Sequence, residues 1–237
     1  MYGSAAESLW GHVMGLLPRV RRLLVVIAHP DDESFGLGSV LAAFIAQGAS
    51  ATVLCFTRGE RSTLGPGDDD LAATRQQELL AASRVLAVEE TIILSYPDGA
   101  LSEAPVQELA HHVLEHSDDV DALLVFDEQG VTGHPDHCAA TAAALAAAAA
   151  LDLPVLAWAI PSAVAEQLNA ELSTAFVGRD EEELDLVIAV DRRSQLAAVA
   201  CHRSQSTTNP VLRRRLDLLG DTEHLRVLRR TSALPVS

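Results

Sequence analysis

Residues 23–38 read LLVVIAHPDDESFGLG. The six apolar residues 23–28 run without interruption, and such a short run is typical of a strand buried on both faces of a parallel sheet. Pro30 cannot donate to a ladder of backbone hydrogen bonds, so the strand must end there. The polar cluster at residues 29–33 then lies at the carboxyl end of the strand, where open α/β sheets bind their ligands.

The residue types in this cluster indicate a metal site. Imidazole and carboxylate groups together are good ligands for a divalent transition ion. His29 and Asp32 are three residues apart across a turn, so both can reach one ion, while Asp31 between them is free to handle a proton. A catalytic zinc site needs a third protein ligand. The segment GHPDH at residues 133–137, which also follows an apolar strand, offers one.

The order of these motifs resembles that of the PIG-L/LmbE family of zinc-dependent N-deacetylases. HPDDE follows a hydrophobic strand, and GHPDH comes much later in the chain. Further segments match in the expected order between about residues 22 and 205: TRGE at 57–60, RQQEL at 75–79, YPDG at 96–99 and HRSQ at 202–205. HPDD alone is a weak pattern, whereas the ordered set is a specific one.

This resemblance implies a metal-dependent hydrolase that removes the acetyl group from an N-acetylated sugar or glycoconjugate, with metal-activated water attacking a GlcNAc-type amide. One Zn²⁺ per chain is expected on three ligands, His29, Asp32 and His137. By the same resemblance, Asp31 is the general base, and protonated His134 stabilises the oxyanion or protonates the leaving amine. Asp136 is expected to hydrogen-bond a histidine and hold its orientation.

The resemblance also implies substrate contacts at Arg75 and Asp98. Read from the residues alone, Arg75 is merely spaced to pair with Glu78 one helical turn away, and Asp98 could simply shape a turn. Family members that act on glucosaminyl-inositol carry a tyrosine just before the second motif, where this chain has Val131 and Thr132. The sugar, the acyl group and the pathway are therefore left open, as is the role of the HRSQ motif.

Other functions compete with deacetylation. An amidase of the same fold would act on a larger thiol–sugar or secondary-metabolite conjugate, and the depth of the acyl slot beside the metal would distinguish the two. A non-catalytic metal-binding homologue would have lost turnover, and intact Asp31 and His134 argue against it. A dinucleotide-binding protein is not supported, because no G-x-G-x-x-G follows the first strand.

The succession of elements predicts an α/β fold, a Rossmann-like three-layer sandwich with a mostly parallel central sheet and helices on both faces. Strands are expected at residues 23–28, 51–56, 91–95, 121–126, 153–159, 184–190 and 224–230. Helices are expected at residues 9–18, 36–47, 71–86, 103–116, 137–151, 161–172, 192–202 and 212–219. Residues 61–70 form either a surface loop or a lid. Since no repeat or linker is evident, residues 1–237 should form a single domain, with the motifs between about 22 and 205.

Composition excludes several partners. The net charge is −16 and all 17 basic residues are arginine, which disfavours nucleic acids and anionic membrane surfaces. No apolar run reaches membrane-spanning length, and residues 1–20 lack the pattern of a signal peptide. The three cysteines form no C-x-x-C motif and fit a reducing compartment. We therefore expect a cytoplasmic enzyme with a small-molecule substrate, and homo-oligomer formation is left open.

Overall fold

Strand β1 (Arg22–Ile27) lies inside a seven-stranded sheet, between β2 (Ser50–Thr57) and β4 (Ala122–Phe126), in the computed structural model, which describes residues 17–64 and 70–231. Five of its six residues are buried. Leu23 and Val25 contribute to one hydrophobic core and Leu24 and Val26 to another, because successive side chains of a strand point to opposite faces. The prediction of a strand buried on both faces is confirmed.

The strand order is β3-β2-β1-β4-β5-β7-β6. The remaining strands are β3 (Glu90–Tyr96), β5 (Val155–Ala159), β6 (Leu186–Ala189) and β7 (Thr222–Arg229). Strands β1 to β5 are paired in parallel, whereas β7 runs antiparallel to both β5 and β6. Successive strands are added outward from β1 to β3, and then the chain returns to place β4 on the other side of β1. The carboxyl ends of β1 and β4 therefore flank the switch point where such sheets bind ligands.

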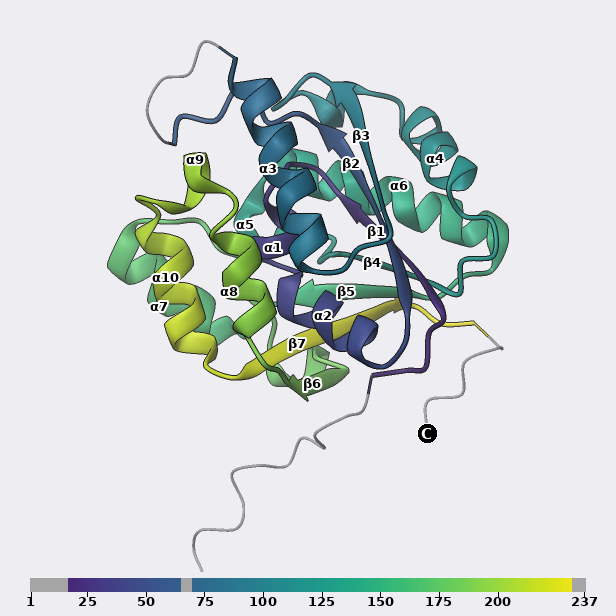
Figure 1. The fold of residues 1–237 in the computed structure, drawn as a ribbon. Coiled ribbons are helices and arrows are strands. Elements are labelled where there is room, and N and C mark those ends of the chain that lie inside the picture. Colours follow the sequence, from purple (N-terminus) through teal and green to yellow (C-terminus); the bar gives the residue numbers. More distant parts are fainter. Residues whose placement is uncertain (1–16, 65–69, 232–237) are drawn as a thin grey trace, which may run out of the picture.

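Helices cover both faces of the sheet, as predicted (Figure 1). One face is covered by α2 (Gly38–Ala46), α3 (Leu71–Val85), α7 (Ser162–Leu172), α8 (Arg193–Val199) and α10 (Pro210–Leu219). The other is covered by α4 (Val106–Glu115) and α6 (Pro135–Leu151). The fully buried apolar side chains of the alanine-rich α6 are all alanines, so the helix can lie close to the strands. No helix in residues 17–64 or 70–231 is long and apolar enough to cross a membrane.

Differences from the predicted elements are concentrated near proline and near the polar motifs. The helix expected from residue 103 begins only at Val106, after the 3₁₀ turn η1 (Leu101–Glu103), because Pro105 lacks an N–H and disfavours helical geometry at Ala104. The short helices α1 (Asp32–Phe35), α5 (Gly130–Gly133) and α9 (Arg203–Ser206) and the 3₁₀ turn η2 (Glu181–Glu183) were not predicted. Most of the helix expected at residues 9–18, and residues 65–69 of the proposed lid, lie outside the described residues.

Candidate metal centre

The two polar motifs meet at the carboxyl ends of β1 and β4. His29 follows β1, Asp32 begins α1, and His137 lies in the first turn of α6. The Nδ1 atom of His29 is 3.2 Å from Nε2 of His137, which is 3.0 Å from Oδ1 of Asp32. Ligands held tetrahedrally at about 2.0–2.1 Å from one zinc ion are roughly 3.3 Å apart. The three predicted ligands therefore have the spacing of a single-ion site.

The hydrogen bonds on the far side of each ring determine which nitrogen carries the proton. Nε2 of His29 lies 3.1 Å from a carboxylate oxygen of Asp98 and 3.3 Å from one of Asp136. Nδ1 of His137 lies 3.0 Å from the backbone carbonyl oxygen of Gly130. Because these oxygens can only accept, both outer nitrogens carry hydrogen, and the two inner nitrogens face each other and Asp32 with lone pairs. The lone pairs of these donor atoms repel one another unless a cation lies between them.

The electrostatics of the site also favour a bound positive charge. Burial lowers the pKa of His29, but hydrogen bonds to Asp136 and Asp98 outweigh it and raise this pKa to about 10. Burial raises the pKa of Asp32, and the neighbouring His137 and His29 hold it well below its usual range. Backbone N–H groups of Ala28 and His29 also donate to Oδ2 of Asp32, at 3.2 and 2.9 Å. A divalent ion would compete with a proton for the space between the donor atoms of His29, Asp32 and His137.

Asp31 lines the cavity that opens at the metal site, but it does not belong to the group of donor atoms formed by His29, Asp32 and His137. Its φ angle of 128° is unusual for a residue other than glycine. This conformation is held by its backbone N–H, which donates to Oε2 of Glu33 at 3.0 Å. Its Oδ2 atom lies 3.0 Å from Nη2 of Arg75. Burial raises the pKa of Asp31 to about 6, while Arg75 pulls it down and Asp32 pushes it up.

Arg75 of α3 is buried and directed at Asp31 by two backbone carbonyls. Its guanidinium donates to the carbonyl oxygen of Gly59 at 2.7 Å and to that of Pro30 at 2.5 Å. A Cβ atom on Gly59, which has φ of +63°, would lie 2.1 Å from Nη1 of Arg75. Because Gly59 has no side chain, the TRGE segment leaves room for the Arg75 guanidinium. The four residues of this segment do not line the cavity. Arg75 does line the cavity, so its predicted contact with substrate stays a prediction.

Replacing Gly59 with alanine should displace Arg75 and so lower turnover by at least about tenfold. The positive φ costs an alanine about 1 kcal/mol, and the clash adds about 1–3 kcal/mol of destabilisation. Gly48→Ala is the matched control, because Gly48 also has a positive φ (+96°) but no atom within 4 Å of the added Cβ. Thermal unfolding and amine-release rates of the two variants check this. Equal effects of both substitutions on turnover would contradict the role given to Gly59.

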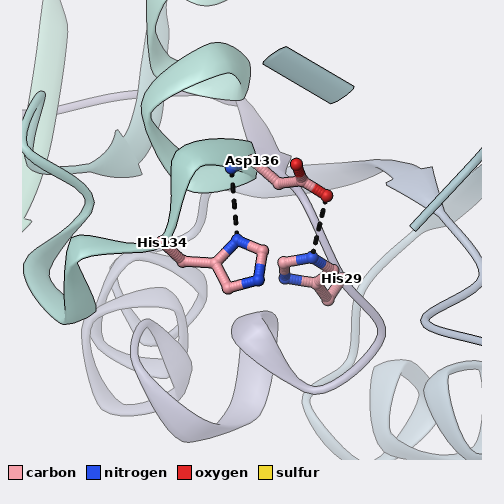
Figure 2. A group of neighbouring side chains, drawn as sticks. All are labelled: His29, His134 and Asp136. Atoms are coloured by element: carbon pink, nitrogen blue, oxygen red, sulfur yellow. Dashed lines mark hydrogen bonds and ion pairs between the residues drawn. The ribbon is translucent and has the colours of Figure 1, made fainter. Parts of the chain in front are cut away.

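His134 and Asp136 lie beside His29, at the start of α6 (Figure 2). Nδ1 of His134 accepts the backbone N–H of Asp136 at 3.2 Å, so the neutral ring carries its proton on Nε2, the nitrogen on the side of His29 in Figure 2. Burial and the neighbouring imidazoles of His29 and His137 lower the pKa of His134. The lowered pKa favours a neutral ring at pH 7, whereas the sequence-based mechanism used a protonated one.

Asp136 is fixed by backbone donors. Its Oδ2 accepts from the N–H of Gly99 at 2.7 Å and its Oδ1 from that of Leu101 at 3.0 Å. His29, His134 and Asp136 also have donor atoms within 4.8 Å of one another. Both carboxylate oxygens of Asp136 and Nδ1 of His134 already accept backbone hydrogen bonds, whereas the backbone donors to Asp32 both reach its Oδ2 and leave Oδ1 for an ion. This second group is therefore the weaker candidate for a metal site. The contact of Asp136 with His29 is the one expected of an orienting residue.

Asp98, after β3, also contacts the metal site. Besides its contact with Nε2 of His29, its Oδ2 accepts the backbone N–H of Arg61 at 2.8 Å. Burial raises the pKa of Asp98, but His29 and the backbone of Arg61 lower it to about 2. Asp98 lines the cavity as well, so a substrate contact remains a prediction.

The HRSQ motif, whose role the sequence left open, supports the segment that carries Asp31. His202 and Glu33 are fully buried, and Nε2 of His202 lies 2.7 Å from Oε1 of Glu33, the side chain that accepts the N–H of Asp31. Ser204 donates through its backbone N–H and its hydroxyl to Glu78 of α3, at 2.8 and 2.6 Å. The importance of Glu33 was missed, although it belongs to the HPDDE motif, because its partner lies 169 residues away.

A cavity of about 640 Å³ opens at these residues. It is lined by the three donors, Asp31, His134 and Asp98, and also by residues of α10 and the segment before it, including Arg215. Phe35, Phe126 and Phe176 give it an apolar part. Its volume is within the range of about 300–1,000 Å³ that is common for small-molecule sites.

Comparisons with known proteins agree with this arrangement. A curated 1D-myo-inositol 2-acetamido-2-deoxy-α-D-glucopyranoside deacetylase of Streptomyces griseus is 36% identical over 155 residues, which cover 54% of this chain and 48% of that protein. The chain spans about half the length of this relative and of another from Streptomyces avermitilis.

Solved structures share the fold at lower identity. A deacetylase of the teicoplanin biosynthesis pathway has a TM-score of 0.68 at 22% identity, over 90% of this chain and all of that one (100%). GalB, the 4-carboxy-2-hydroxymuconate hydratase of Pseudomonas putida, has a TM-score of 0.64 at 17% identity, over 92% and 100% of the two chains. Because a deacetylase and a hydratase share it, the fold alone does not fix the reaction.

A family model gives the most direct assignment. The model described as PIG-L, GlcNAc-PI de-N-acetylase, matches residues 24–148, more than half of the chain, and this range contains both polar motifs. This protein therefore belongs to the PIG-L family.

Proposed function

We propose that this protein is a metal-dependent N-deacetylase that hydrolyses the acetamide of an N-acetylated sugar or glycoconjugate. The observation that carries the proposal is the convergence of two imidazole lone pairs and one carboxylate, with a further carboxylate, Asp31, on the adjoining cavity wall. The relative from Streptomyces griseus bears the name of an enzyme that removes such an acetyl group.

The residues that would hold the ion are His29, Asp32 and His137. Two nitrogens and one oxygen suit zinc, and the same set also accepts iron or cobalt. Zinc is proposed as the ion because the family resemblance implies it. When bound, one such cation supplies Lewis acidity, which favours water ionisation near neutral pH and polarises a carbonyl group.

Asp31 is proposed to take the proton of the attacking water. Its Oδ2 is engaged by Arg75, so the proton is taken on Oδ1. Arg75 keeps the carboxylate ionised and fixes its direction, and the contact of Glu33 with the backbone N–H of Asp31 fixes the unusual φ angle.

His134 is proposed to act on the other side of the amide. The neutral ring, with its proton on Nε2, donates a hydrogen bond to the carbonyl oxygen as negative charge develops there, and can pass that proton to the leaving amine nitrogen. Asp136 keeps His29 oriented through Nε2. Thr132 lines the cavity where some family members carry a tyrosine nearby, and its shorter side chain leaves more room for substrate.

A screen of amine release tests the proposal. The full chain, loaded in turn with Zn²⁺, Co²⁺ and Fe²⁺, is incubated with N-acetylglucosamine, its myo-inositol conjugate and glucosamines carrying longer N-acyl chains. We expect a primary amine to be released from at least one N-acetyl sugar, and a chelator to abolish this. Release only from the longer N-acyl compounds would favour the amidase alternative. No release from any compound by metal-loaded protein would refute the proposal.

A further inference from the structure

Arg215 is the feature of the cavity that the proposed reaction does not use. It lies on α10, lines the cavity, and is only 5% exposed. Its Nη2 donates to the backbone carbonyl oxygen of Phe35, and its guanidinium carbon lies 5.0 Å from the centre of the Trp158 ring. Its Nε is buried without a hydrogen-bond partner among the described residues.

The other buried arginines in the described part of the chain are all paired with a carboxylate. Arg75 lies 3.0 Å from Asp31, Arg179 lies 2.5 Å from Asp127, and Arg192 lies 2.6 Å from Glu223. Arg215 has no carboxylate within 4.0 Å in residues 17–64 and 70–231. It differs from the other three in that its counter-charge is missing.

Its surroundings do not offset that missing charge. Burying a charge without a partner costs several kcal/mol, whereas a desolvated contact with an aromatic face returns about 2 kcal/mol or more and so offsets only part of this cost. Glu223, Asp32 and Asp31 are near enough to favour the charged form of Arg215. Each of these carboxylates already has a closer partner, since Arg192 engages Glu223, His137 engages Asp32 and Arg75 engages Asp31. Burial lowers the pKa of Arg215 to about 10, so the side chain remains charged at neutral pH.

The position of Arg215 indicates what supplies the counter-charge. The first turn of α10 also lines the cavity, so the positive end of this helix lies at the same wall. A guanidinium is shaped to bind carboxylate and phosphate through two parallel hydrogen bonds. A substrate whose amide lies at the metal site could therefore present a second, anionic group to this wall.

We propose that Arg215 recognises an oxyanion, a carboxylate or phosphate, carried by the substrate in addition to its N-acyl amide. This inference rests on the proposed function and names the substrate class: an N-acyl amino sugar or conjugate with a negative charge. The charge can lie on the sugar side or at the far end of the acyl group. The substrate named for the relative from Streptomyces griseus, in contrast, has no ionised group.

Ligands that resemble the two products test the inference without turnover. The zinc-loaded full chain is titrated calorimetrically with glucosamine and glucosamine 6-phosphate, which probe the sugar side, and with acetate and succinate, which probe the acyl side. In at least one pair, we expect the member with the additional anionic group, glucosamine 6-phosphate or succinate, to bind at least tenfold tighter than its partner. In Arg215→Gln this advantage should disappear, whereas Arg215→Lys should keep part of it.

Arg213→Gln is the matched control, because Arg213 is an exposed arginine on the same helix. It removes the same charge and should leave the preference intact. Because the native protein must itself show the preference, the test does not depend on a variant that folds. Equal affinities within both pairs, or a preference that survives in folded Arg215→Gln, would overturn the inference.

Amine release from N-acetylglucosamine by the native protein is measured in parallel, to keep the two claims separate. Release without any oxyanion preference would overturn only the role of Arg215. Oxyanion binding that depends on Arg215, without release from any N-acyl sugar, would overturn only the proposed function.

Discussion

Replacing Asp31 with alanine is expected to lower kcat at least about a hundredfold while the protein keeps its metal ion. A positioned general base contributes roughly 10²–10⁴-fold to a rate. Asp31 lies on the cavity wall outside the proposed ligand set, whereas Asp98, which also lines the cavity, is engaged by Nε2 of His29. Zinc content and steady-state amine release, measured on the same preparation, check this.

The dependence on pH should identify the same group. The carboxylate must be ionised to accept a proton, so activity falls as pH falls through the pKa of Asp31. Burial raises that pKa to about 6, and a cation bound nearby would lower it, so the acidic limb of kcat/KM should lie at or below pH 6. The residual activity of Asp31→Ala should lack this limb.

Asp118→Ala is a control for loss of a carboxylate, since Asp118 is exposed and distant from the cavity lining. It should behave like the native protein. If Asp31→Ala kept its zinc and turned over at a near-native rate, another group would have to be the base.

Replacing His137 with alanine is expected to weaken zinc affinity at least about a hundredfold. Loss of a residue that only orients a ligand already costs about 10–100-fold, and loss of the ligand itself should cost more. Metal analysis after dialysis against a weak chelator should give one zinc per chain for the native protein and nearly none for the variant. Turnover should fall in parallel.

Two other histidine variants complete this experiment. His112→Ala should keep its zinc, because His112 of α4 contacts Tyr96 and Glu115 and does not line the cavity. His134→Ala should keep zinc and lose turnover. If His134→Ala lost the ion and His137→Ala kept it, the alternative group of His29, His134 and Asp136 would be the metal site.

The sheet and the proposed ligands were predictable because their signals are local. The apolar runs of β1 and β4 are buried on both faces; the first polar motif follows β1 directly, and the second follows β4 after a short connecting segment. Because both strands are parallel and adjacent, their carboxyl ends meet, and this brings His29 and His137 together. The ordered motifs also predicted the family to which the chain belongs.

The surroundings of Asp31 were not predictable, because they depend on distant parts of the chain. Arg75 looked like one member of a surface pair on a helix, yet its guanidinium is directed inward by carbonyl groups from two other loops. Glu33 was only the last residue of the HPDDE cluster and was given no role, because its partner His202 is near the other end of the chain. The late start of α4, in contrast, could have been predicted from the sequence, because Pro105 is a local signal that ends or delays a helix.

The most direct test of the proposed metal site is an anomalous difference map at the zinc absorption edge, from crystals of zinc-loaded protein. The account predicts one peak per chain, about 2.0–2.2 Å from Nδ1 of His29, a carboxylate oxygen of Asp32 and Nε2 of His137. A peak bound instead by His134 and Asp136, or none between these three donors in protein shown to carry zinc, would contradict it.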